Sequence, residues 1–196
     1  GPSWGGAAVA MSYECKERGI PCVLFYPKRK SFVARQMLAK KNGAKIVQVP
    51  FGRLSVIKHR AKEYQKETGY CLVKWGGGDD ASIAIKEAAY QVKEKLKHEK
   101  IDSLWCASGS GTLIKALSKI FDIPCYGVVV GYGLKEKDFP NVKKFYKHPF
   151  EFKQQTAYTP PFNSCRHYDA KAFEIMKRKT RKDEKVLFWN VMEHHV

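Results

Sequence analysis

Two glycine-rich turns in this chain have the composition of anion-binding sites. The first is Ser3-Trp4-Gly5-Gly6-Ala7, and the second is Ser108-Gly109-Ser110-Gly111-Thr112, which follows the apolar run Ile101–Ala107. A strand that enters a glycine-serine turn and then a helix leaves backbone N–H groups pointing outward at the positive end of the helix dipole, where phosphate binds. Two such turns predict a phosphorylated cofactor or substrate held between two lobes.

Each turn also has a purely structural interpretation. In the second turn, phosphate would bind to backbone N–H groups and to the hydroxyls of Ser110 and Thr112, but a tight strand-to-helix turn also needs glycine for its backbone angles. No Gly-Lys-Ser/Thr follows it, which excludes a Walker A loop. In the first turn, Ser3, Trp4, Gly5 and Gly6 either bind a substrate carboxylate on helix N-terminal amides or provide a plain N-cap at Ser3.

Short apolar runs that alternate with helical patterns must position these turns. Continuously apolar strands separated by helices are typical of a parallel sheet with both faces covered, so we expect a doubly wound α/β fold. Both turns would then lie at the carboxyl ends of strands, where such sheets bind ligands. The predicted strands are residues 22–26, 46–49, 70–75, 103–107, 124–131 and 186–189, and the predicted helices are residues 5–18, 31–42, 53–67, 80–99, 111–121 and 168–179.

The chain divides into two predicted lobes at the glycines of residues 75–80. We expect a small lobe of residues 1–75 and a large lobe of residues 76–196, with Asp79 or Asp80 as the N-cap of the long helix. No strand precedes the first turn, so we also expect that an N-terminal portion is missing. Residues 132–167 break the alternation, and their aromatic side chains either stack on nucleic-acid bases or pack an irregular segment onto the sheet.

Composition restricts the class of protein. Apolar residues make up 44% of the 196, but no apolar stretch approaches the ~20 residues that span a bilayer, and no secretory signal opens the chain. The six cysteines form no CxxC pair, so we expect no structural zinc but small buried thiols in a reducing cytoplasm. The histidines and the Asp79-Asp80 pair also suggest no metal site. The net charge of +17 fits either an anionic partner such as nucleic acid or a lysine-rich solvated surface.

The order and spacing of several motifs resemble the fold type II pyridoxal-phosphate enzymes, the group of tryptophan synthase β, threonine synthase and D-cysteine desulfhydrase. The opening Ser3–Ala7 turn resembles the family's Ser-x-Gly-Asn-His turn, and Ser108–Leu113 resembles its phosphate cup. The other matching segments are Arg18–Leu24, Gln36–Val47, Gly127-Val128, Tyr168–Phe173 and Val186–Asn190. The likeness covers nearly the whole chain. It implies two lobes with mostly parallel sheets and pyridoxal 5'-phosphate as cofactor.

Three departures from the family pattern concern the chemistry. The family carries a Schiff-base lysine upstream of the first turn, and no lysine stands at a matching position here. The family's asparagine at the cofactor's phenolic oxygen is Gly6 in this chain. The closing strand is followed by Asn190-Val191-Met192-Glu193 instead of His-Thr-Gly-Gly, and valine cannot hydrogen-bond a pyridine nitrogen. The phosphate cup is thus retained without the residues that tune the cofactor.

The resemblance leaves two functions open. The first is a pyridoxal-phosphate enzyme with lyase, deaminase or β-replacement chemistry on an amino acid or amine, including an amine attached to nucleic acid. As cofactor ligands it implies Ser108, Gly109, Ser110, Gly111, Thr112 and Asn190, and as substrate ligands Ser3, Trp4, Gly5 and Gly6. The catalytic lysine would come from the absent segment or from another chain, in a homo-oligomer or a mixed assembly. The second is a non-catalytic descendant that serves as a basic nucleic-acid-binding or assembly protein.

Overall fold

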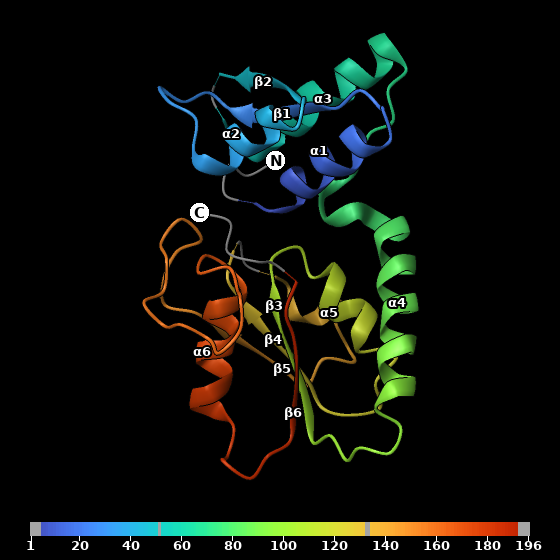
Figure 1. Ribbon diagram of the computed structural model, residues 1–196, viewed down its shortest axis with the longest axis vertical. Helices are drawn as coiled ribbons and strands as arrows, with labels where there is room; N and C mark the ends of the chain where they lie inside the picture. The colour runs from blue at the N-terminus through green and yellow to red at the C-terminus, as the bar shows by residue number, and fades with distance from the viewer. Residues whose placement is uncertain (1–4, 51, 132–133, 192–196) are drawn as a thin grey trace. The chain divides into compact units, whose positions relative to one another are not determined.

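The computed structural model describes residues 5–50, 52–131 and 134–191, and these form two compact units (Figure 1). The chain up to Lys74 builds the first unit, and the chain from Trp75 onward builds the second. Both units contain parallel strands with helices between them. The predicted fold class, α/β with mostly parallel sheets, is therefore confirmed.

The first unit is a two-stranded parallel sheet with helices on both faces. Leu24 and Tyr26 point toward α1 and α2, where they pack with Ala39 and Ala44. Phe25 points to the other face, where its ring meets that of Tyr64 on α3 at a centroid distance of 5.6 Å. The elements in chain order are α1 (Ala7–Glu17), β1 (Val23–Pro27), α2 (Ala34–Lys41), β2 (Lys45–Val49) and α3 (Leu54–Thr68).

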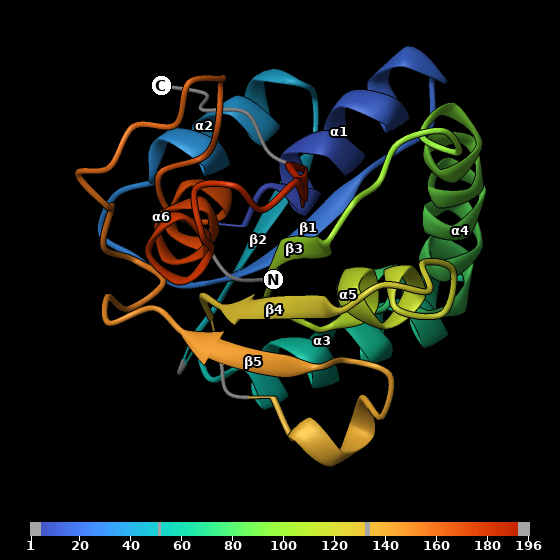
Figure 2. The same ribbon diagram turned by 90° about the horizontal axis from the view of Figure 1, so that it is seen from below.

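The second unit is a four-stranded parallel sheet in the order β5-β4-β3-β6. Every residue of the central strand β3 is buried, because α4 and α5 cover one face and α6 covers the other (Figure 1). Figure 2 shows β3, β4 and β5 side by side, with their arrows in the same sense. The elements are η1 (Trp75–Gly77), α4 (Gly78–Lys95), β3 (Ser103–Ser108), α5 (Thr112–Leu117), β4 (Cys125–Val129), η2 (Glu136–Asp138), β5 (Lys144–Lys147), α6 (Asp169–Lys179) and β6 (Val186–Trp189).

One predicted strand does not form, and one observed strand was not predicted, for the same physical reason. Residues 70–75 form no strand, and Tyr70 and Val73 are 39% and 58% exposed. Conversely, the short strand β5 lies inside the segment that lacks a recognisable pattern. A strand exists only where a neighbour completes its hydrogen bonds, and β5 has β4 whereas residues 70–75 join the two units.

Two local predictions are also corrected. The N-cap of α4 is Gly77 and not Asp79 or Asp80, because the chain enters the helix through three glycines with positive φ, residues 76–78. Both aspartates therefore fall inside the first turn of the helix. Cys106 and Cys125 are buried as expected, whereas Cys22 is only partly buried and Cys71 is exposed, since its expected strand does not form.

A polar cluster fastens the segment between β5 and α6 to the second unit. The Glu174 carboxylate accepts a hydrogen bond from the Thr156 hydroxyl, lies 3.3 Å from Nε2 of His148 and pairs with Arg178. Burial alone would raise the pKa of Glu174, but the hydrogen bonds from Thr156 and His148 and the charge of Arg178 outweigh it and lower the pKa. The charged carboxylate is thus the stabilised form.

Replacing Glu174 with Gln is expected to destabilise the second unit in a pH-dependent way. A lowered folded-state pKa gives stability that is present above the unfolded-state pKa and is lost as the pH falls through the folded value. We expect E174Q to lower the free energy of unfolding by about 1–3 kcal/mol at pH 7, and the deficit to shrink below about pH 4. Urea unfolding at pH 7 and pH 3.5 measures both. The control E87Q changes an exposed carboxylate of α4; a deficit for E174Q that is equal at both pH values would contradict the prediction.

Candidate functional site

The turn between β3 and α5 is the best-formed anion site among the predicted residues. Ser108 ends the buried strand, Gly109 and Ser110 make the turn, and Gly111 is the N-cap of α5 with φ 84°. Gly111 has no side chain to cap the helix, and the Thr112 backbone N–H donates to the Ser110 hydroxyl over 3.4 Å. The Ser110 and Thr112 hydroxyls lie 3.1 Å apart at this end of the helix. Backbone N–H groups and two hydroxyls thus converge at the carboxyl edge of the sheet, as phosphate binding requires.

Two glycines allow neighbouring segments to close around this turn. A Cβ atom on Gly76 would lie 2.5 Å from Ser110 Oγ and 2.6 Å from Thr112 Oγ1. A Cβ on Gly111 would lie 2.4 Å from the Phe139 ring. Both glycines have positive φ, so a side chain there would be strained as well as crowded. The turn is therefore a narrow cradle. Neither Gly76 nor Gly111 places a side chain between its polar groups.

Tyr168 and Asp169 support the turn from beneath, and the sequence analysis assigned neither a role. The Tyr168 hydroxyl lies against Gly109 and accepts a hydrogen bond from its backbone. Burial raises the pKa of Tyr168 well above its ordinary value, and the charge of Asp169 adds to this. Asp169 itself is fully buried in the first turn of α6 and raises the pKa of the neighbouring Cys106 thiol, which burial already elevates. The only sequence signal for a role of Tyr168 and Asp169 was their position at the start of a predicted helix, directly after the irregular segment.

Asn190 lies at the same edge of the sheet as the turn. It follows β6, whose Trp189 is paired with Cys106 of β3, and Ser108 stands two residues beyond that pair. The Asn190 side-chain amide donates to the Asn163 carbonyl oxygen over 3.1 Å. Its Oδ1 atom is buried and accepts no hydrogen bond from the described residues. The structure thus brings Asn190 and the Ser108–Thr112 turn to one edge.

The first glycine turn is only partly described. Ser3 and Trp4 lie outside the described residues, while Gly5 leads into Gly6, the N-cap of α1. The Gly6 carbonyl oxygen accepts hydrogen bonds from the backbone N–H groups of Val9 and Ala10, each over 3.0 Å. This turn belongs to the first unit and the other turn to the second, so their joint use in one site remains a prediction.

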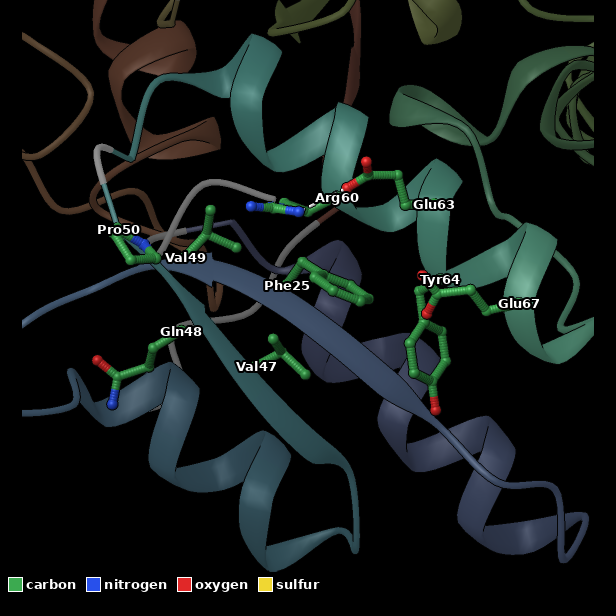
Figure 3. A pocket seen from close by; sticks show the side chains of 9 residues that line it. All are labelled: Phe25, Val47, Gln48, Val49, Pro50, Arg60, Glu63, Tyr64 and Glu67. Carbon is green, nitrogen blue, oxygen red and sulfur yellow. Dashed lines mark hydrogen bonds and ion pairs between the residues drawn. The ribbon is translucent and has the colours of Figure 1, made fainter.

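A pocket of about 210 Å³ lies within the first unit (Figure 3). Its floor is the apolar face of β1 and β2 with Phe25 and Val47, and Tyr64 of α3 forms one wall. Arg60 and Glu63 form an ion pair of 2.8 Å at its rim. The hollow forms because α3 covers this face of the two-stranded sheet incompletely. All of its lining residues belong to the first unit, so the glycine turn of the second unit does not line it.

The described residues show neither a cluster that could hold a metal ion nor a helix that could span a membrane. No group of three or more His, Cys, Asp or Glu side chains in this part of the chain is arranged to hold a metal ion. Within the same residues, none of the helices combines the length and the apolar character that crossing a membrane needs.

Solved structures with low sequence identity share this fold. An ACC deaminase homologue has a TM-score of 0.75 and 18% identity, covering 96% of this chain and 70% of its own. O-ureido-L-serine synthase has a TM-score of 0.75 and 12% identity, with 94% and 68% covered. A hydrogen sulfide-producing enzyme from Fusobacterium nucleatum has a TM-score of 0.70 and 13% identity, with 98% and 76% covered.

Sequence comparison identifies the family. A search of curated protein sequences gives no match. The family described as pyridoxal-phosphate dependent enzyme, in contrast, matches residues 1–179, which include both glycine turns and nearly all of the fold. The fold and this match agree, and the chain belongs to the pyridoxal-phosphate-dependent enzyme family, whose cofactor is pyridoxal 5'-phosphate.

Proposed function

We propose that this chain binds pyridoxal 5'-phosphate through the Ser108–Thr112 turn and serves lyase, deaminase or β-replacement chemistry on an amino acid or small amine. When bound, the cofactor supplies an electron sink for a carbanion next to the substrate nitrogen. The observation that carries the proposal is the cradle itself, in which the N-terminal amides of α5 and the paired hydroxyls of Ser110 and Thr112 meet at a strand end.

The residues of the cradle fit a phosphate group. A side chain on Gly76 would collide with the Ser110 and Thr112 hydroxyls, whereas one on Gly109 or Gly111 would collide with Tyr168 or Phe139. A phosphate carries acceptor oxygens, and the cradle offers N–H and O–H donors. Asn190, with a buried amide oxygen at the same edge, would contact the bound cofactor. Ser3, Trp4, Gly5 and Gly6 would hold the substrate carboxylate on the N-terminal amides of α1.

Asp169 would supply the partner for the cofactor's pyridine nitrogen that the residues after β6 lack. Val191 cannot pair with a pyridine nitrogen, but an aspartate is a common partner for that nitrogen in its protonated form. The Asp169 carboxylate is completely buried beside Cys106, and the adjacent Tyr168 is hydrogen-bonded to Gly109 of the cradle. We therefore propose that the Asp169 carboxylate would pair with the protonated ring nitrogen of the bound cofactor.

Removing the cradle hydroxyls is expected to weaken cofactor binding selectively. Each hydroxyl makes a hydrogen bond to a charged group, so S110A and T112A should each weaken pyridoxal-phosphate binding about tenfold. Fluorescence titration of the full chain with pyridoxal phosphate measures this. Pyridoxal, which lacks the phosphate, should bind weakly and equally to all variants. S118A, past the last residue of α5, is the matched control. If both cradle variants bind pyridoxal phosphate as tightly as the wild type does, the turn is only structural.

Changing Asp169 is expected to alter the spectrum of the bound cofactor. Loss of the carboxylate removes the group that stabilises a protonated ring nitrogen, so D169N should lower the pKa of that nitrogen. The absorbance of bound pyridoxal phosphate, followed from pH 5 to pH 10, reports it. D169E should restore most of the effect, and D183N, an exposed control, should leave the spectrum unchanged. The assignment is wrong if D169N folds, binds cofactor and gives the wild-type titration.

A second candidate function is nucleic-acid binding, and one observation favours it. Residues 18–62 contain 12 Lys and Arg and no Asp or Glu. Residues 1–74 therefore carry 15 basic and 4 acidic residues, against 21 and 15 in residues 75–196. Arg18 and Arg60 pair with glutamates just outside the acid-free run. This first unit would attract a phosphate backbone, either because the substrate amine is attached to nucleic acid or because the chain is a non-catalytic binding descendant.

Nucleic-acid affinity is expected to fall steeply with salt and to depend on the first unit. Between 50 and 200 mM salt the affinity should drop about tenfold or more. K40Q/K41Q, which removes two exposed charges of α2, should reduce the slope of log affinity against log salt by about two. K135Q/K137Q in the second unit is the charge-matched control. Fluorescence anisotropy with a labelled oligonucleotide measures both, and no binding at low salt removes this candidate.

A further inference from the structure

The end of α1 brings two cysteines together that are seven residues apart in the sequence. After α1 the chain reverses at Gly19, whose φ is 65°, and the backbone N–H of Ile20 donates to the Cys15 carbonyl oxygen over 2.8 Å. The Gly19 N–H donates to the Lys16 carbonyl oxygen over 3.1 Å. This pair of bonds is the Schellman closure of a helix. It returns the chain so that Cys22, immediately before β1, comes beside Cys15.

The two thiols are in contact and partly accessible. The Cys15 and Cys22 side chains lie within hydrogen-bonding reach of each other, and each is only partly buried. Cys22 packs against the core of the first unit that contains Leu24 and Tyr26. Both cysteines belong to the first unit, so their contact is independent of how the two units are placed.

The surroundings favour a neutral pair. Burial, together with the charge of Cys15 and a hydrogen bond to it, raises the pKa of Cys22 to about 11. Burial, and then the charge of Cys22, raises the pKa of Tyr26 to about 12. The Tyr26 hydroxyl has no hydrogen-bond partner among the described residues. The raised pKa slows attack by the thiolate, but the disulfide, once formed, carries no charge that this partly buried site would have to accommodate.

We propose that Cys15 and Cys22 are a modification site, a dithiol that forms a reversible disulfide tying the end of α1 to the start of β1. A small disulfide such as oxidised glutathione is the oxidant. One cysteine thiolate attacks a glutathione sulfur, a mixed disulfide forms and one glutathione thiolate leaves. The second cysteine loses its proton to water and attacks the protein-side sulfur of the mixed disulfide, which releases the second glutathione. Two electrons pass from the dithiol to the oxidant.

Peptide mapping of the full chain tests the proposal. The chain is incubated with oxidised glutathione, remaining thiols are alkylated, and trypsin is added without reductant. Cleavage after Lys16 and Arg18 places Cys15 in residues 1–16 and Cys22 in residues 19–28, so the disulfide joins two peptides of known mass. We expect this linked pair to exceed any other cysteine pairing about tenfold or more, because the fold gives the two thiols a high effective concentration. Dithiothreitol should remove it.

The controls separate a built pair from general oxidation. C15S and C22S should each abolish the linked peptide and leave the remaining cysteine glutathionylated, whereas C71S, at an exposed cysteine, should change nothing. In 8 M urea the preference for the Cys15–Cys22 pair should disappear. Oxidised wild type should also unfold at a higher temperature than reduced wild type, a difference that C15S lacks. The proposal is overturned if natively folded wild type gives glutathione adducts on both cysteines and no linked peptide.

Discussion

Close packing around the turn between β3 and α5 is the constraint on which the rest of the second unit depends. Gly76 and Gly111 can adopt positive φ, and without side chains they admit the Ser110 and Thr112 hydroxyls and the Phe139 ring to within van der Waals contact. A larger residue at either position would push away the groups that phosphate needs. The same absence of side chains thus serves the packing and, under the proposed function, the binding of the cofactor.

The irregular segment before α6 contributes to this packing because it positions the residues that contact the turn. The Glu174 cluster fixes the segment to α6, and the helix then begins with Tyr168 and Asp169. Tyr168 bonds to Gly109, and Asp169 is buried beside it. Residues that lack any regular pattern therefore lead directly to the two side chains that underlie the cradle. This explains why a segment without secondary-structure periodicity contributes so much buried polar chemistry.

The two units divide the properties of the chain between them. The second unit holds the cradle and the smaller charge excess, 21 basic against 15 acidic residues, while the first holds most of the excess positive charge and the Cys15–Cys22 contact. The family match covers residues 1–179 and therefore includes both the cradle and the basic first unit. A simple solvated surface would spread the +17 charge evenly, but this chain concentrates it in the first unit.

The sequence by itself determined the α/β class, the family and the cofactor, because apolar periodicity and glycine spacing are local properties that survive in the linear order. It also located the Ser108–Thr112 turn, whose glycines and hydroxyls are consecutive. It could not separate residues 70–75 from a strand, find β5 or bring Cys15 to Cys22, since each depends on a partner distant in sequence or on a chain reversal. Only the tertiary structure showed that Asp169 is buried and that Tyr168 reaches Gly109, because burial and contact are properties of the packed chain.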